Sequence, residues 1–150
     1  MKIRNYTSSV PVERSISEIE SLLVEAGATH VARSYEKQKI TGFIFQLWVG
    51  DRPVTFKLPS NPDAVSKVLS GDVKRPRQGT MKKIEAQADR TAWRLLHEWV
   101  HIQITMIIMK QAEAIQVFLP YAYDAKNDQT YFEKIKSSGF KLLEAKGANS

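Results

Sequence analysis

The hydrophobic pattern of residues 29–58 restricts the fold of this chain most, because it alternates with a period of two. The alternation falls into three runs, and Gly50-Asp51 is a tight-turn signal between the last two. Phe43 and Phe45 lie on the same side of the central run, so both would face the core of a sheet. The pattern predicts a three-stranded antiparallel meander with one face on the core.

A helical pattern precedes this sheet. Apolar residues recur at helical spacing over residues 16–26, and Gly27 follows where a left-handed C-terminal cap is favoured. Ser15 and Glu18 match a capping box, in which each side chain would satisfy a free backbone donor at the helix start. The sequence therefore predicts an N-terminal helix of about three turns.

Two further helices are predicted after the sheet. Asn61-Pro62 favours the start of a short helix that would end at Gly71. A much longer helical pattern then runs from about residue 82 to about residue 117. An unbroken helix of that length would span about 50 Å, more than the width of a small domain. We therefore expect a break or a projecting end near Gln111, or a partner helix.

The length of 150 residues fits a single domain, and we expect one globular α+β domain over residues 1–150. Its antiparallel sheet would have three strands, or four if residues 140–143 form another. The sheet would pack on the N-terminal helix and on the one long helix of the C-terminal half.

Composition excludes several classes of protein. The chain has no cysteine, which rules out disulfides, thiolate metal sites and a cysteine nucleophile. No apolar run is long enough to span a membrane, and the N-terminus lacks the apolar region of a signal peptide. We expect a cytoplasmic protein with no membrane partner. The formal net charge of +6 is compatible with an acidic partner such as DNA or RNA.

Basic residues gather in the middle of the chain. Residues 71–83 read as a flexible basic loop, and further cations continue at helical spacing as a stripe along the long helix. Such cations can bind nucleic-acid phosphates, although interleaved acidic residues also fit a solvated helix face. The predicted nucleic-acid-binding residues are Lys74, Arg75, Arg77, Lys82, Lys83, Arg90 and Arg94.

The segment HEWVH matches the HExxH pattern of zinc hydrolases. On a helix, His97 and His101 would face the same way and could share a zinc ion, with Glu98 as general base. No third ligand is indicated, and Arg90 and Arg94 lie on the same side, where their charge opposes a metal. The leading expectation is that the site binds no metal and has no catalytic residue. The two histidines would then lie on a polar face, with Glu98 paired to Arg94.

The sequence also resembles a family of small phage, prophage and bacterial proteins to which no activity is assigned. The resemblance extends over nearly the whole chain and is carried by Ala92-Trp93-Arg94, Trp99, Gln103 and Phe118-Leu119-Pro120-Tyr121. In that family the two histidine positions are usually other polar residues, so HExxH would be private to this chain. The resemblance implies a phage-associated context and no particular activity.

These patterns support one leading function and two alternatives. The leading expectation is a non-enzymatic accessory protein of a phage or mobile element that binds nucleic acid through its basic loop and helix stripe, without a cofactor. One alternative is a zinc-dependent hydrolase that uses HEWVH. The other is a protein-interaction module that acts on a host protein, with a possible homodimer through residues 102–109 of the long helix.

Overall fold

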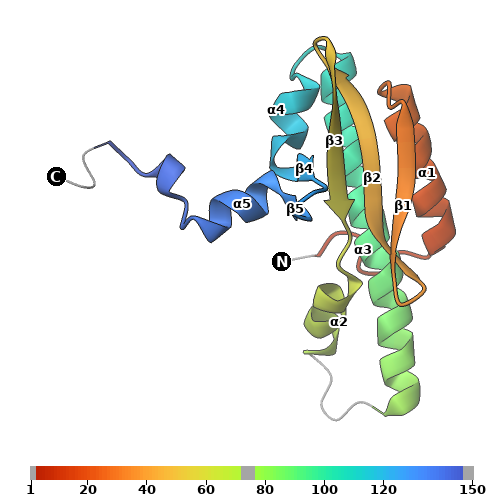
Figure 1. Ribbon diagram of the computed structural model, residues 1–150. Coiled ribbons are helices and arrows are strands. Elements are labelled where there is room, and N and C mark those ends of the chain that lie inside the picture. Colours follow the sequence, from red (N-terminus) through yellow and green to blue (C-terminus); the bar gives the residue numbers. More distant parts are fainter. Residues whose placement is uncertain (1–2, 72–76, 147–150) are drawn as a thin grey trace.

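The computed structural model describes residues 3–71 and 77–146 (Figure 1). A three-stranded antiparallel sheet packs on two helices, α1 and α3, and smaller elements follow α3. The elements of the first half are α1 (Val12–Glu25), β1 (His30–Glu36), β2 (Lys39–Val49), β3 (Arg52–Pro59) and α2 (Pro62–Ser70). Those of the second half are α3 (Gln78–Ile108), α4 (Ala114–Phe118), the 3-10 turn η1 (Leu119–Tyr121), β4 (Tyr123–Asp124), β5 (Gln129–Thr130), α5 (Tyr131–Ser137) and η2 (Lys141–Leu143).

The sheet confirms the predicted meander, with strand order β1-β2-β3. Phe45 pairs with Val31 on one side and with Phe56 on the other, so apolar residues meet across all three strands. Gly50 has φ 65° in the turn between β2 and β3, a conformation that glycine adopts without strain. The possible fourth strand at residues 140–143 is absent, because residues 141–143 form η2 and Phe140 is its N-cap residue. A separate two-stranded sheet of β4 and β5 lies beside β3 instead.

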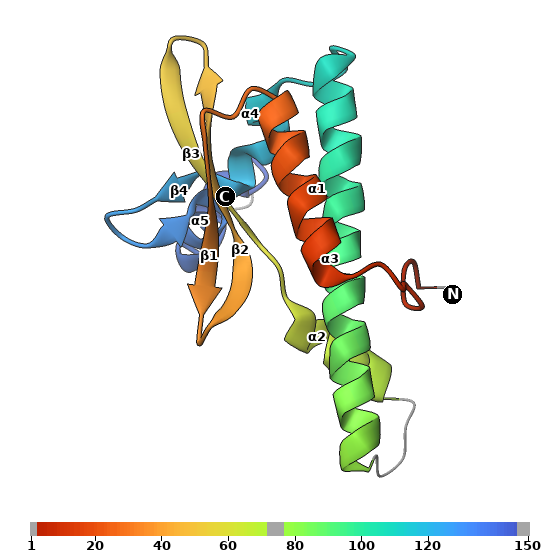
Figure 2. The same ribbon diagram turned by 90° about the vertical axis from the view of Figure 1, so that its right-hand side faces the viewer.

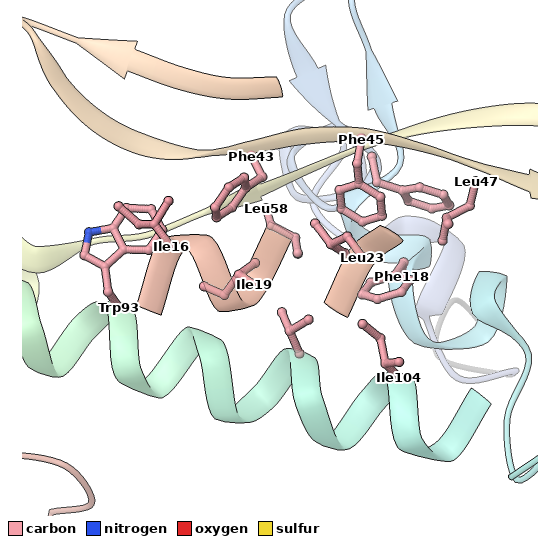
Figure 3. Packing of buried hydrophobic residues seen from close by; sticks show 12 residues of the cluster. Ile16, Ile19, Leu23, Phe43, Phe45, Leu47, Leu58, Trp93, Ile104 and Phe118 are labelled. Atoms are coloured by element: carbon pink, nitrogen blue, oxygen red, sulfur yellow. The ribbon is translucent and has the colours of Figure 1, made fainter. Parts of the chain in front are cut away.

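The hydrophobic core lies between the sheet and the two helices α1 and α3. Figure 2 shows α1 and α3 side by side on the same face of the sheet. Figure 3 shows Phe43 and Phe45 of β2 pointing from the sheet toward α1 and α3, with Phe43 near Trp93 of α3 and Phe45 near Leu23 of α1, and all four are buried. Phe118 of α4 closes the same cluster, with its ring centroid 5.4 Å from that of Phe45.

The start of α1 differs from the prediction. The helix begins at Val12, directly after Pro11, and it has no side-chain cap. Ser15 and Glu18 therefore lie inside the helix, and the predicted capping box is wrong. The end of α1 is as expected, since Gly27 follows it with φ 98°.

The long helix starts earlier and ends earlier than predicted. It starts at Gln78, so residues 78–83 are helical, contrary to the predicted loop over 71–83. Residues 72–76 of that loop lie outside the described residues. The helix ends at Ile108, and Lys110 has φ 58°, so the expected break near Gln111 is confirmed. At 31 residues, α3 spans about 45 Å.

Replacing Phe45 by alanine tests the core. Phe45 is fully buried between Phe56 and Phe118, so Phe45→Ala should lower the free energy of unfolding by about 3–5 kcal/mol. Urea titration followed by circular dichroism measures this change. Trp48→Ala on the same strand is the control, because Trp48 is 56% exposed and should cost less than about 1 kcal/mol. Equal losses for the two variants would contradict the described burial.

Candidate functional site

The N-terminal end of α3 is electropositive for two reasons that reinforce each other. Arg77 is the N-cap residue, its side chain makes no capping hydrogen bond, and the first turn contains no acidic residue. The free N–H groups and the helix dipole therefore place partial positive charge at this end. Lys82 and Lys83 follow in the next turn, and both are exposed, as is Arg77. Arg77 thus lies where a helix normally favours anions, and two further cations follow in the second turn.

These cations have no internal partner within the described ranges. Neither Arg77 nor Lys82 nor Lys83 lies within salt-bridge distance of a described carboxylate. In Figure 2 this end of α3 extends beyond the sheet, with α2 alongside. Lys67 in the last turn of α2 is also exposed and brings a fourth cation to the helix that packs beside α3. The sequence analysis missed Lys67, although a basic residue just before the basic loop was a usable signal.

Arg90 and Arg94 belong to the interior contacts of the fold. The Nε of Arg90 donates to the backbone oxygen of Ser8 at 3.2 Å, and its Nη2 donates to Gln87 at 2.6 Å. Arg94 donates to the Glu18 carboxylate of α1 at 2.8 Å. Arg90 and Arg94 are therefore bound to other parts of the protein, whereas Arg77, Lys82 and Lys83 are exposed. Lys74 and Arg75 lie outside the described residues.

The N-terminal segment, residues 3–10, explains why Arg90 is not free. This segment crosses the side of α3 that faces away from the sheet, and the hydroxyl of Thr91 donates to the backbone oxygen of Asn5 at 2.9 Å. Arg4 of the same segment pairs with Glu98. The predicted pairing of Glu98 with Arg94 is therefore wrong, because each residue has a partner from another part of the chain.

The HEWVH segment does not form the arrangement that a zinc hydrolase requires. His97 is buried between α1 and α3, with its Nε2 3.0 Å from Glu18 Oε2, so it does not lie on a polar face as predicted. Its ring centroid lies 6.0 Å from that of His101. Arg4 holds Glu98 in an ion pair and lowers its pKa, which weakens it as a general base. Nowhere in the described part of the chain do three His, Cys, Asp or Glu side chains form a possible metal-binding group.

Glu18, Arg94 and His97 meet at the α1–α3 contact, where the neighbouring charges shift the pKa values of Glu18 and His97. The Arg94 and Arg14 guanidinium groups hold the pKa of Glu18 below its usual value. Burial lowers the pKa of His97, and the nearby Arg94 acts in the same direction. Glu18 is thus the anion of the contact and Arg94 its principal cation, while burial disfavours the protonated form of His97. The contact stabilises the packing of two helices and leaves little capacity to bind a further cation.

Comparison with known proteins adds no functional assignment. No protein-family model matches the chain, and no curated protein or solved structure matches it significantly. The phage-associated context therefore stays a prediction. The residues that carried this resemblance include Trp93 and Phe118, which are core residues here, and Arg94, which joins α3 to α1. Among the described residues, no helix is long and apolar enough to cross a membrane.

The buried His97 predicts a pH dependence of stability. Its pKa is lower in the folded state than in the unfolded state, so the unfolded chain binds more protons as the pH falls. The free energy of unfolding should therefore decrease between about pH 7.5 and about pH 5.5, around the unfolded histidine pKa of about 6.5. His97→Gln should flatten this dependence in urea titrations. His101→Gln, which removes an exposed histidine, is the control and should keep it. An unchanged slope in His97→Gln would contradict the assignment.

Proposed function

We propose that the protein is a non-enzymatic nucleic-acid-binding protein whose contact surface is the N-terminal end of α3. Arg77, Lys82 and Lys83 form this cationic end, and Lys67 of α2 lies on the neighbouring helix. The phosphates of DNA or RNA are the ligands that such a group would bind. A cytoplasmic accessory protein of a phage or mobile element is the biological context we favour, on the basis of the resemblance in sequence.

One observation carries the proposal: a long helix has exposed cations at its N-cap and in its second turn, its N-cap side chain makes no capping hydrogen bond, and its first turn has no acidic residue. Acidic residues and capping side chains usually stabilise such an end, so this arrangement costs stability in the absence of an anion. A phosphate group would satisfy both the free N–H groups and the side-chain charges. Local departures from the usual stabilising pattern are expected at functional positions.

The position of the cationic end also suits a long, linear ligand. Because this end of α3 projects beyond the sheet, a nucleic acid can approach it without contact with β1, β2 or β3 (Figure 2). The nearby Glu85 is exposed and reduces the net charge, so we expect modest affinity and little sequence preference. Phosphate contacts fix position and affinity, whereas base contacts would be needed for specificity.

Neither alternative from the sequence has equal support as the function. The hydrolase would need Glu98 free and a third metal ligand, and Glu98 is held by Arg4. The interaction-module alternative rests on residues 102–109, which lie at the other end of α3 from the cationic end. The two surfaces are therefore separable, and each can be tested without the other.

The salt dependence of binding tests the proposed function. Fluorescence anisotropy would follow a labelled 30-base-pair duplex and a single-stranded RNA at about 50–200 mM salt. Each phosphate contact contributes about −0.9 to the slope of log K against log salt on duplex DNA and about −0.7 on single strands. A triple change of Arg77, Lys82 and Lys83 to Ala should therefore reduce the magnitude of the duplex slope by about two to three units.

The matched control removes the same charge elsewhere. A triple change of Lys126, Lys136 and Lys141 to Ala also removes three exposed cations, from the segment around β5, α5 and η2. It should leave the slope unchanged. Equal effects of the two triple variants would show non-specific attraction to a basic protein, and absence of binding at 50 mM salt would refute the function.

A further inference from the structure

A hollow of about 750 Å³ opens at one end of the sheet, where the β1–β2 turn, the start of α2 and the middle of α3 meet. Its polar lining includes Ser60, which precedes α2, and Asp89 and Trp93 of α3. Apolar side chains complete the walls: Val12, Ile40, Pro59 and Pro62. A concave surface of this size, with a few polar groups among apolar ones, is typical of small-molecule sites.

Trp93 presents the only polar group of its side chain at this hollow. The residue is 2% exposed, and its ring packs edge-on against Phe43 in the core. Figure 3 shows the indole nitrogen on the side of the ring away from Phe43, at the edge of the cluster. No described residue accepts a hydrogen bond from this N–H group. Because buried polar groups are nearly always hydrogen-bonded, the free donor indicates an acceptor that enters the hollow.

Two further polar groups of the hollow lack partners. Asp89 lies one helical turn before Trp93 on the same side of α3, and its carboxylate forms no hydrogen bond or ion pair with any described residue. Partial burial raises the pKa of Asp89, because the charged form loses hydration. The buried hydroxyl of Ser60 also lacks a hydrogen-bond partner in the described part of the chain. The hollow therefore offers a free acceptor, a free donor and a hydroxyl that can act as either.

The charges around the hollow differ between its two walls. In Figure 2, the β1–β2 turn lies on one side, and α2 and α3 lie on the other. The turn contributes the exposed Lys37 and Lys39, with Glu36 as its one acidic residue in the lining, whereas the helices contribute Asp63 and Asp89. A ligand with an anionic group at one end and hydrogen-bond donors at the other would match both walls.

We propose that this hollow binds a guanine nucleotide, with the base against Asp89 and Trp93 and the phosphate toward the lysines of the turn. Guanine carries a ring N–H and an exocyclic amino group side by side, and one carboxylate can accept hydrogen bonds from both. The neighbouring carbonyl oxygen can accept from the Trp93 N–H. Each of the other bases offers a single donor group on this edge. The choice of a nucleotide over other small molecules rests on the proposed nucleic-acid-binding function.

The nucleotide can be free or an unpaired residue of a single strand. Lys82 of the cationic end lies seven residues before Asp89, which places it on the same side of α3 at about 10 Å along the helix. A single strand bound at the cationic end can therefore reach the hollow with an unpaired base, and this would add the base contact that phosphate contacts lack. A duplex cannot do so, because pairing occupies the same edge of guanine.

The indole N–H resonances of nitrogen-15-labelled protein report on the hollow directly. Guanosine monophosphate should shift the Trp93 resonance, which Trp93→Phe identifies by its loss. Adenosine monophosphate should bind at least tenfold more weakly, since its base offers one donor group. Inosine monophosphate, which lacks only the exocyclic amino group, should fall between them. An unmoved Trp93 resonance at millimolar guanosine monophosphate, or equal binding of the three nucleotides, would overturn the proposal.

Asp89→Asn tests the acceptor with almost no change in size. It should weaken guanosine monophosphate binding at least tenfold and leave the protein folded, because burial already disfavours the carboxylate that it replaces. Glu85→Gln is the matched control, since it removes the same charge one turn earlier on α3, at an exposed position outside the lining. It should leave binding unchanged. The same loss in both variants would reduce the effect to general electrostatics and contradict the site.

An oligonucleotide with one guanine separates the two sources of the ligand. If the wild-type protein prefers this single strand to the same strand with inosine, and Asp89→Asn does not, the hollow takes an unpaired base. If there is no preference while guanosine monophosphate still binds, the hollow takes the free nucleotide. The triple change of the cationic end should alter the salt dependence on duplex DNA and retain guanosine monophosphate binding, so that failure of either proposal is distinguishable from failure of the other.

Discussion

Phe43, Phe45 and Phe56 present three aromatic rings on one face of the sheet, and all three are fully buried. Removing so much apolar surface from water needs cover along the whole length of β2, which α1 and α3 provide together with Phe118. This burial fixes where α3 lies and which of its sides faces the core. The position of the cationic end of α3 and its contacts with residues 3–10 follow from that placement.

The polar contact between α1 and α3 fixes the relative position of the two helices more closely than apolar packing, which has no preferred direction. Glu18 joins Arg94 and lies beside the buried His97, so two helices far apart in sequence meet in one relative position. Hydrogen-bonded charges at a partly buried contact discriminate against shifted packings, since a shift would leave a carboxylate or guanidinium without its partner. The same residues that suggested catalysis or nucleic-acid contact in the sequence thus help to define the fold.

The sheet, the end of α1 and both ends of α2 were predictable from the sequence because their signals are local. Alternation marks β2, Gly27 follows α1, and the side chain of Asn61 caps α2 as expected. The roles of Arg90 and Arg94 were not predictable in this way. Their partners Ser8 and Glu18 lie 82 and 76 positions away, and only tertiary packing brings them together. Helical spacing indicated which residues share a side of α3 but not which side would be covered.

The helix α3 carries the cationic end, the contacts with residues 3–10 and a large part of the core, so its helical phase relates all three. Each residue of an α-helix advances the side-chain direction by about 100°. A one-residue deletion between Lys83 and Gln87 would therefore rotate the cationic end relative to both the core side and the N-terminal contacts. Substitutions can alter these surfaces one at a time, but a change in the length of α3 alters the angular relation among all of them.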